Sequence, residues 1–315
     1  MTATETPPET SPVGERSSNR STRGEPLVVL VTGASSGIGR ATAVELAGRG
    51  ARLVLLARGP EALEETAAEV RTAGAGDAVV CPVDVNDAAA LQEAVDGIVA
   101  RFGRLDVVVH SAQVMAYGRI EDVPAKVFET VVDTSIHGTA NLARTVLPVF
   151  RRQGAGHLVI VSSLLASVAT PLMGSYIAAK WGQQGLIRVL QIETRDVPGI
   201  SVSAVSPGGV DTPIYYQAAS WLGSTGRPPP PVYSPQRVAR KIVSVIERPR
   251  RLVQAGFLNP LIIAGFRLAP AVFDALVTPL LKLGGLANNS VPPTEGNVFA
   301  SKPEKNATEG RWRSI

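Results

Sequence analysis

Short aliphatic runs that alternate with helix-forming segments are the feature that most constrains how this chain can fold. The runs are rich in Val, Leu, Ile and Ala, and they predict buried strands at 27–31, 52–57, 78–83, 105–109, 157–161 and 200–205. The intervening segments predict helices at about 37–49, from residue 60, and at 88–102, 125–152 and 174–195. Strands joined by such helices run parallel, with right-handed crossovers that place helices on both faces. The pattern therefore predicts an α/β protein with a doubly wound parallel sheet.

Composition agrees with this prediction and excludes several other classes of protein. Of the 315 residues, 45% are hydrophobic but only 5% are aromatic, as suits an aliphatic α/β core. The net charge of +4 is too small over this length to indicate nucleic-acid binding. A single cysteine, Cys81, allows neither an internal disulfide nor a cysteine-built zinc site, and three histidines offer little for another metal. We expect a protein of a reducing, cytoplasmic compartment without a bound metal.

Changes in composition suggest where the domain begins and ends. Residues 1–25 contain no Leu, Ile, Phe, Tyr or Trp, and this predicts a disordered N-terminal tail without a secretory signal. The α/β domain is expected over 26–250, an apolar helical extension over 251–286, and a loose polar tail over 287–315.

A glycine-rich loop, Thr32-Gly33-Ala34-Ser35-Ser36-Gly37-Ile38-Gly39, joins the first strand to the first helix. The first glycine permits a tight turn, the second lets the backbone approach a pyrophosphate, and the third lets the helix pack closely on the sheet. Amides at the helix start then point at the anion. Because it lies between a strand and a helix, the loop predicts the phosphate cradle of a Rossmann-type sheet. The candidate cofactor contacts here are Gly33, Ser35, Ser36, Gly37, Ile38 and Gly39.

The end of the second strand indicates which dinucleotide is bound. NAD enzymes usually carry Asp or Glu at this point to bond the ribose 2′-hydroxyl. Here the strand ends at Ala57-Arg58, and the guanidinium can hold a 2′-phosphate through two hydrogen bonds. We therefore expect NADP(H) in preference to NAD(H), although Arg58 could instead only cap a solvated loop.

Three polar residues form a candidate catalytic group. Tyr176 and Lys180 lie four residues apart and share one helix face, and Ser163 lies thirteen residues before the tyrosine. The lysine ammonium is expected to lower the tyrosine pKa, which is near 10 in the free residue. Tyr176 is then a general acid or base towards a carbonyl or an alcohol, and Ser163 stabilises the same oxygen. By itself, a Tyr-x-x-x-Lys pair is also typical of an ordinary amphipathic helix.

The Thr-Gly-x-x-x-Gly-x-Gly loop and the Ser163, Tyr176 and Lys180 spacing together resemble the short-chain dehydrogenase/reductase family, over about Leu27 to Ile246. The resemblance implies that Lys180 also grips the nicotinamide ribose, that Asp84 and Val85 lie beside adenine, and that 207–213 approaches the nicotinamide amide. The further cofactor contacts expected from it are Ser111, Ala112, Pro207, Gly208, Val210 and Thr212, together with Tyr176 and Lys180.

Two segments depart from the pattern of that family. Where the family shows Asn-Asn-Ala-Gly, this chain has His110-Ser111-Ala112-Gln113, so a glutamine replaces a glycine beside the cofactor. We expect His110 to be a structural substitute for Asn rather than a catalytic group. The family's Asn that helps hold a proton-relay water is replaced by Ser135, which we keep as a catalytic candidate.

The C-terminal extension combines charge with apolar surface. A basic run over 237–251 precedes an apolar stretch over 252–285, which is too short between its prolines and charges to span a membrane. Short amphipathic helices beside basic residues suit an anchor on an anionic membrane surface. They equally suit a cover over the substrate cleft, which would imply a lipophilic substrate. A subunit contact is a third use, which the sequence favours less.

These features lead to one functional hypothesis and one alternative. The hypothesis is an NADP(H)-dependent oxidoreductase, a homo-oligomer, that acts on the carbonyl or secondary alcohol of a small, lipophilic molecule. The alternative, motivated by the two departures, is a catalytically weak cofactor-binding sensor or scaffold, at a membrane surface. A soluble cytoplasmic protein and a peripherally membrane-associated one are both compatible with the sequence.

Overall fold

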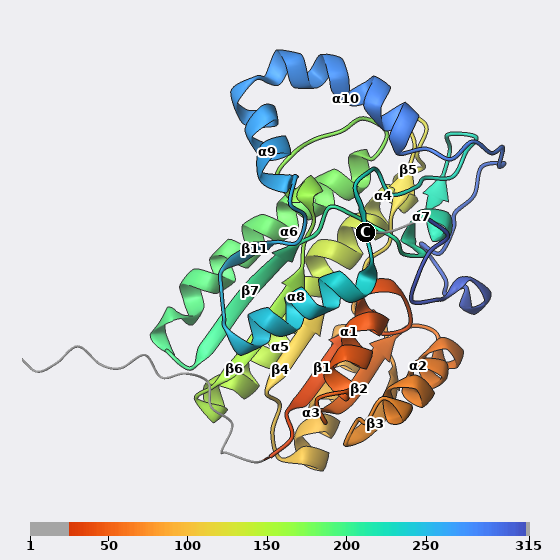
Figure 1. Cartoon of the computed structure of the whole chain (residues 1–315). Helices are drawn as coiled ribbons and strands as arrows, with labels where there is room; N and C mark the ends of the chain where they lie inside the picture. Colours follow the sequence, from red (N-terminus) through yellow and green to blue (C-terminus); the bar gives the residue numbers. More distant parts are fainter. Residues whose placement is uncertain (1–24, 313–315) are drawn as a thin grey trace, which may run out of the picture.

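The structure, a computed structural model, describes residues 25–312. The predicted disordered tail therefore lies, except for Glu25, outside the described residues. A seven-stranded sheet with the order β11-β7-β6-β4-β1-β2-β3 forms the centre of the molecule (Figure 1), and every neighbouring pair is parallel. Its strands are β1 (Val28–Thr32), β2 (Arg52–Ala57), β3 (Asp77–Pro82), β4 (Val107–His110), β6 (Gly156–Val161), β7 (Ile200–Ser206) and β11 (Leu252–Gln254). The predicted doubly wound parallel sheet is confirmed.

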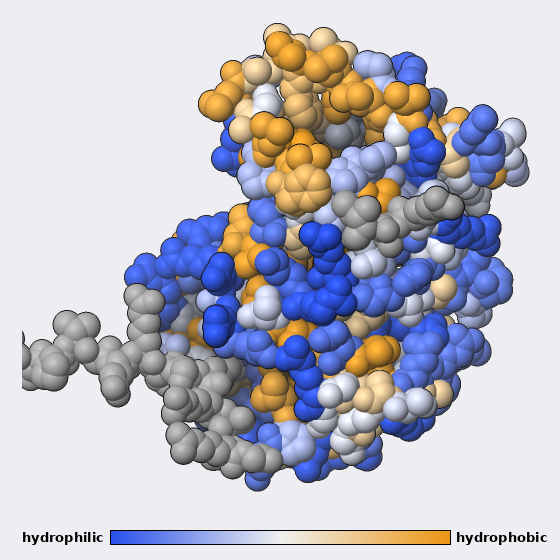
Figure 2. Space-filling view, in the orientation of Figure 1, coloured by the Kyte–Doolittle hydropathy of each residue, from blue (hydrophilic) through white to orange (hydrophobic). Residues whose placement is uncertain are grey.

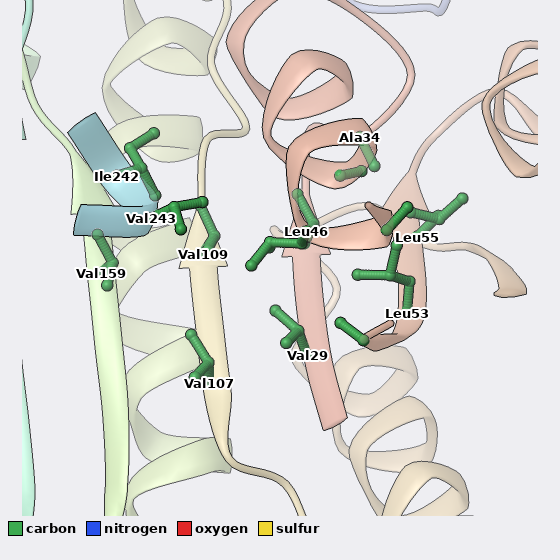
Figure 3. Close-up of a cluster of buried hydrophobic side chains, with 14 of the residues drawn as sticks. Val29, Ala34, Leu46, Leu53, Leu55, Val107, Val109, Val159, Ile242 and Val243 are labelled. Atoms are coloured by element: carbon green, nitrogen blue, oxygen red, sulfur yellow. The ribbon is translucent and has the colours of Figure 1, made fainter. Parts of the chain in front are cut away.

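Helices cover both faces of this sheet. One face carries α1 (Gly37–Ala47), α2 (Pro60–Thr72) and α8 (Pro235–Glu247), and the other carries α3 (Ala88–Phe102), α5 (Gly138–Gln153) and α6 (Gly174–Glu193). Successive strand residues alternate between the two cores: Val29 and Val31 enter the first, Val28 and Leu30 the second. Figure 3 shows the first core, where Leu46 of α1 packs near Val29. Because both faces are buried, the strands are aliphatic throughout instead of alternating with polar residues.

The helix predicted over 125–152 is interrupted at a candidate residue. It is divided into α4 (Ala125–Val132), a π-helical turn (Asp133–His137) and α5. Ser135 lies in this turn and is fully buried. Its carbonyl accepts hydrogen bonds from two side chains, the Thr139 hydroxyl and the Gln183 amide. Such turns are frequent at functional sites. This one directs the backbone carbonyl of Ser135 towards Gln183 of α6.

The sheet extends further along the chain than the predicted domain boundary at residue 250. Leu252–Gln254, assigned from the sequence to the apolar extension, pairs with β7 as the edge strand β11. The prediction missed this strand because it is three residues long, follows three arginines and exposes Leu252. Two small parallel pairs lie beside the main sheet: β5 (Ala116–Tyr117) with β9 (Ala219–Ser220), and β8 (Gly209–Val210) with β10 (Val232–Tyr233).

The rest of the extension is a helical pair on the outside of the domain. The pair, α9 (Asn259–Leu268) and α10 (Pro270–Gly284), is joined at Ala269, and Phe266 of the first packs edge-to-face on Phe273 of the second. A short helix, α7 (Ile214–Gln217), precedes this helical pair in the sequence. Within residues 25–312, no helix is long and apolar enough to cross a membrane.

The segment after α10 is not the loose tail that composition predicted. Residues 287–312 return to the domain (dark blue in Figure 1) and form hydrogen bonds with residues as distant in sequence as Ser36. Val298 is fully buried and belongs to the core cluster of Tyr117 and Tyr176. For these residues the prediction was wrong, because most of the contacts are made by backbone groups, which leave no trace in a polar composition.

Candidate active site

A cavity of about 260 Å³ lies at the carboxyl ends of the parallel strands, the usual position of a ligand site in a doubly wound sheet. It brings together most of the residues selected from the sequence. Those that line it are Gly33, Ser35, Ser36, Gly37, Ile38, Arg58, Asp84, Val85, Ser111, Ala112, Ser163, Tyr176, Lys180, Pro207, Gly208, Val210 and Thr212. Gly39 and Ser135 do not line it.

The glycine-rich loop has the geometry that its sequence predicts. Gly33 has a φ of +66°, and a Cβ there would lie 2.8 Å from the amide nitrogen of Ala112. Gly37 has a φ of +54°, and its Cβ would lie 3.1 Å from the Thr212 side chain. A Cβ on Gly39 would overlap the carbonyl of Gly33, so this glycine serves helix packing and not the cavity wall. The loop is a bare-backbone cradle at the start of α1, which fits a dinucleotide pyrophosphate.

The returning C-terminal segment occupies the polar groups of this cradle. The carbonyl oxygen of Ala307 accepts from the amide of Gly37 at 2.9 Å and from the hydroxyl of Ser36 at 3.1 Å. No sequence pattern predicts this contact, because the acceptor is a backbone carbonyl and any residue carries one.

Arg58 also forms hydrogen bonds with the returning C-terminal segment. Its two terminal nitrogens donate to the carbonyls of Val298 at 2.8 Å and Asn297 at 2.5 Å. Burial lowers the pKa of this arginine, against the opposing charge of Asp84. The side chain therefore both lines the cavity and bonds two backbone carbonyls of the segment.

The candidate catalytic group lines the same cavity. Tyr176 and Lys180 come from the first turns of α6 and are 9% and 2% exposed. The ammonium of Lys180 lies 5.8 Å from the centre of the Tyr176 ring. It donates to the carbonyl of Val161 at 3.1 Å and to Oε1 of Gln183 at 2.9 Å. Ser163 follows β6 and its hydroxyl accepts from the amide of Leu165 at 3.1 Å.

Burial controls the protonation of this group. It raises the pKa of Tyr176 to about 12, with a smaller lowering by the Ser163 hydroxyl. It also lowers the pKa of Lys180 to about 7. Burial outweighs the lowering expected from the lysine, so the pKa of Tyr176 lies above its usual value, because removal of both groups from water disfavours their charged forms. At neutral pH the phenol therefore keeps its proton.

His110 has a structural environment. It is 1% exposed, and its ring nitrogens lie 2.8 Å from the Thr32 hydroxyl and 3.0 Å from the Thr139 hydroxyl. Burial, and then the charge of Lys180, lower its pKa to about 3, so the ring is neutral near pH 7. These contacts agree with a substitute for a hydrogen-bonding asparagine.

The two departures from the family pattern contact each other. Ser135 donates through its hydroxyl to Oε1 of Gln113 at 2.7 Å, and Gln113 donates to the carbonyl of Val114 at 2.8 Å. The side chain of Gln113 is thus long enough to reach the hydroxyl of the shorter Ser135. Sequence reasoning missed Gln183, whose Nε2 donates to the hydroxyl of Thr139 at 2.9 Å while its Oε1 holds Lys180.

The remaining wall of the cavity is mostly apolar. It is formed by Met115, Tyr117, Leu165, Met173, Ile214, Tyr215 and, from the helical extension, Leu281 and Gly285. The last turn of α10 thus borders the cleft, while the rest of this helix lies on the surface. Of the three roles considered for the extension, cleft cover is the one that this contact supports.

A dinucleotide cradle at the switch of a doubly wound sheet, with a tyrosine and a lysine on one helix, defines a nicotinamide-dependent oxidoreductase fold. The sequence model of the family described as "short chain dehydrogenase" matches residues 27–223, and the chain belongs to this family.

Individual relatives share both the sequence and the fold. The chain is 32% identical, over 79% of its length and 80% of the relative's, to "Dehydrogenase/reductase SDR family member 7B" from Bos taurus. The structure of an alcohol dehydrogenase from Thermococcus sibiricus complexed with 5-hydroxy-NADP matches with a TM-score of 0.63 and 28% identity, covering 73% of this chain and 95% of that one. A metagenomic short-chain oxidoreductase in complex with NADP matches with a TM-score of 0.61 and 26% identity, covering 72% and 95%.

Proposed function

We propose that this protein is an NADP(H)-dependent reductase of a carbonyl group in a lipophilic small molecule, with oxidation of the corresponding alcohol as the reverse reaction. The observation that carries the proposal is that Ser163, which follows β6, and Tyr176 and Lys180 of α6 share one cavity with the glycine cradle between β1 and α1.

Each catalytic side chain has a distinct role in the proposed reaction. When bound, the dinucleotide supplies the hydride in reduction and accepts it in oxidation. Tyr176 donates its phenolic proton to the carbonyl oxygen as negative charge develops there. Ser163 donates a hydrogen bond to the same oxygen. Lys180 places a positive charge near the phenolate that forms, and this lowers the free energy of the ionised tyrosine. With a pKa raised to about 12, Tyr176 holds its proton at neutral pH and is thus in the form that can donate it.

The choice of NADP(H) over NAD(H) rests on Arg58. Its guanidinium lines the cavity beside the end of β2, at the position where an acidic residue would select the ribose hydroxyls of NAD. The NADP forms bound to two related structures support the same choice. We expect Arg58→Ala to lower the ratio of NADPH affinity to NADH affinity about tenfold, since one bidentate contact with the 2′-phosphate is lost. An unchanged ratio of the two affinities would contradict the assignment.

The apolar lining supports a lipophilic substrate. Beyond the cradle and the candidate catalytic group, the lining carries two methionines, two tyrosines and several aliphatic side chains, among them Leu281 of α10. Burial of apolar substrate surface against these groups stabilises binding by roughly 25 cal/mol per Å². Ketones with bulky aliphatic or aromatic groups are therefore the substrates to test first.

Tyr176→Phe tests the proposal directly. The variant removes the phenolic proton and keeps the ring, so we expect turnover to fall by about 10² to 10⁴-fold while NADPH still binds. The measurements are NADPH absorbance with a panel of ketones and aldehydes, and NADPH fluorescence for binding. If wild-type protein binds NADPH but reduces no member of the panel, the sensor or scaffold alternative replaces the enzyme.

A second function, docking on an anionic membrane surface, is favoured by the outer face of the helical pair. Figure 2 shows hydrophobic residues gathered over α9 and α10. Leu261, Leu268 and Leu283 are 69%, 84% and 76% exposed. Between residues 248 and 284 the chain has five basic side chains and one acidic one. Exposed leucines beside net positive charge match the interface of an anionic bilayer.

Vesicle flotation distinguishes this docking from other uses of the same face. Wild type should float with vesicles that contain phosphatidylserine and less with pure phosphatidylcholine. Leu268→Ser with Leu283→Ser should lose flotation, and the matched control Ile120→Ser, at a site 63% exposed elsewhere on the surface, should keep it. Equal flotation of all variants would reject the surface, and a larger species in size-exclusion that the double variant abolishes would indicate a homo-oligomer contact.

A further inference from the structure

We propose that Gln183 is a positioning residue for the active site: its side-chain amide fixes the Lys180 ammonium against the backbone of the π-helical turn. The proposal rests on the function proposed above, since it assigns the support of that function's lysine. Gln183 is 1% exposed and lies three residues after Lys180, on the same face of α6.

Both ends of the Gln183 amide are used. Its oxygen accepts from the Lys180 ammonium at 2.9 Å, and its nitrogen donates to the Thr139 hydroxyl at 2.9 Å and to the Ser135 carbonyl at 3.3 Å. An amide held at three points has one orientation, and that orientation presents the oxygen to the lysine. Since a carbonyl oxygen accepting from an ammonium favours the charged form, Gln183 opposes the desolvation of Lys180.

The position of Gln183 also explains why a serine suffices at position 135. The Ser135 hydroxyl is occupied by Gln113, so it does not reach the lysine. The link between the π-helical turn and Lys180 instead runs from the Ser135 carbonyl through the Gln183 side chain. In this chain the side chain that holds the lysine therefore comes from α6 and not from the π-helical turn.

Two substitutions that act in opposite directions test this role. Gln183→Met keeps the volume and removes the acceptor, so the ionisation midpoint of Lys180 should fall by about half a pH unit or more. Gln183→Glu adds a carboxylate beside the ammonium, so the midpoint should rise by a similar amount. Gln191→Met is the matched control, because Gln191 is 7% exposed on the same helix, donates to the carbonyls of Val202 and Arg251, and accepts from Arg188 instead of Lys180.

Nuclear magnetic resonance of the full chain labelled with ¹³C at the lysine side chain measures these midpoints without turnover. The chain has six lysines, and Lys180→Arg assigns the signal. Opposite shifts in the two Gln183 variants, with none in the control, support the proposal. Unchanged midpoints, or equal shifts in all three variants, overturn it. Since the measurement needs no substrate, it separates this result from a failure of the proposed reductase activity.

We infer a second feature from independent contacts: residues 297–310, here called the C-terminal strap, compete with the phosphates of the dinucleotide for the same donors. This inference also rests on the proposed cofactor. The Gly37 amide has a single hydrogen, and it donates this hydrogen to the carbonyl of Ala307. Both terminal nitrogens of Arg58 also donate to carbonyls of the strap. A phosphate oxygen is an acceptor like a carbonyl oxygen, so one donor in this geometry cannot serve both fully.

The strap is fastened at points outside the cradle. Gln217 donates to the Lys305 carbonyl at 2.9 Å and to the Asn306 side chain at 2.8 Å, and it accepts from Asn297 at 3.2 Å. Two residues beyond the strap, the ring of Trp312 packs on Tyr215 with 5.6 Å between ring centres. These contacts hold the strap over the cradle, and they set the free energy that a dinucleotide must overcome to displace it.

A reversible cross-link tests the competition. A Cβ at Gly59 would lie 3.0 Å from the Cβ of Ser301 in the strap, so a small outward shift gives disulfide geometry. Gly59→Cys with Ser301→Cys, in a Cys81→Ser background, should bind NADPH at least tenfold more weakly when oxidised and recover with dithiothreitol. Gln217→Ala should bind NADPH several-fold more tightly than wild type.

Two controls make the result decisive. Ser301→Cys alone should show no change with dithiothreitol. Equal NADPH affinity of the oxidised and reduced double variant, or weaker binding by Gln217→Ala, would overturn the competition. If reduced double variant and wild type both fail to bind NADPH, the proposed cofactor is at fault, and calorimetry with NADH and NADPH shows this separately.

Discussion

The Nδ1 atom of His110 lies 2.8 Å from the hydroxyl oxygen of Thr32, a contact that joins the ends of the neighbouring strands β4 and β1. The other ring nitrogen contacts Thr139 of α5 at 3.0 Å. The histidine therefore connects the glycine cradle, which begins at the end of β1, to the helix that follows the π-helical turn. A side chain at this junction holds two parts of the site together without entering the cavity.

We predict from this contact that His110 stabilises the fold and takes no part in proton transfer. His110→Asn keeps one hydrogen-bonding group and should retain kcat/KM within a few-fold. His110→Leu leaves two buried hydroxyls without this partner and should lower the free energy of unfolding by about 1–3 kcal/mol. Urea denaturation and steady-state kinetics measure both. A large loss of kcat in His110→Asn at unchanged stability would show that the histidine is catalytic.

A second prediction concerns the pH dependence of stability. Burial lowers the pKa of His110 to about 3 and that of His157 to about 4, below the model-peptide value of 6.5. Between these values the unfolded chain binds more protons than the folded one, so stability is fully present above pH 6.5 and falls as pH is lowered towards 4. The slope is at most about 1.4 kcal/mol per pH unit for each histidine.

Urea denaturation at a series of pH values tests this, and His157→Gln is the informative variant. His157 is fully buried and its Nε2 lies 2.8 Å from the Ser203 hydroxyl. The variant should show a shallower decline between pH 6.5 and 4 than wild type. An identical slope would mean that this histidine does not titrate on unfolding.

A third prediction separates two glycines. In Gly39→Ala the new Cβ would overlap the Gly33 carbonyl, so we expect a loss of several kcal/mol of stability and of NADPH binding. In Gly97→Ala, on the exposed face of α3, the Cβ meets nothing within 4 Å. That variant should be more stable than wild type by about 0.5–1 kcal/mol. Thermal unfolding distinguishes the two, and similar effects would contradict the packing role of Gly39.

A fourth prediction concerns the direction of the reaction. The pKa of Tyr176 is raised to about 12 and that of Lys180 is lowered to about 7. Carbonyl reduction uses the protonated phenol and the charged ammonium, so kcat/KM for reduction should decline as pH rises through about 7 and Lys180 loses its proton. Alcohol oxidation uses the phenolate, so its rate should increase towards alkaline pH.

Initial rates in both directions between pH 5.5 and 10 test this prediction. Reduction that is constant across this range would contradict the assignment of the limiting ionisation to Lys180. Oxidation that is fastest at acidic pH would contradict the role of Tyr176 as its base.

The sequence predicted most of the fold and placed most of the site. The aliphatic runs located six of the seven strands of the main sheet, because a strand buried on both faces leaves no polar position. The spacing of Tyr176 and Lys180 placed them on one helix face, since that follows from helix geometry alone. Of the main sheet, only the short edge strand β11 was not predicted, because its three residues lie between a basic run and the apolar extension.

The pKa of Tyr176 differs from the prediction, and the strap was missed, because both depend on contacts between residues that are distant in the sequence. Spacing placed Lys180 beside Tyr176 but could not show that both are removed from water, and desolvation determines both pKa values. Gln183 was overlooked because a glutamine on an amphipathic helix is ordinary until its amide is seen to contact Lys180.

The sequence by itself determined the layers of the fold, the glycine cradle and the positions of the candidate catalytic side chains. These features depend on periodicity and on local backbone requirements, which neighbouring residues determine. Only the tertiary structure decided which groups those side chains and the cradle contact. The contacts of Ala307 with Gly37 and of Asn297 with Arg58 join residues more than 230 positions apart through backbone carbonyls. Since every residue carries the same carbonyl, no sequence pattern specifies such a contact, and the path of the chain alone creates it.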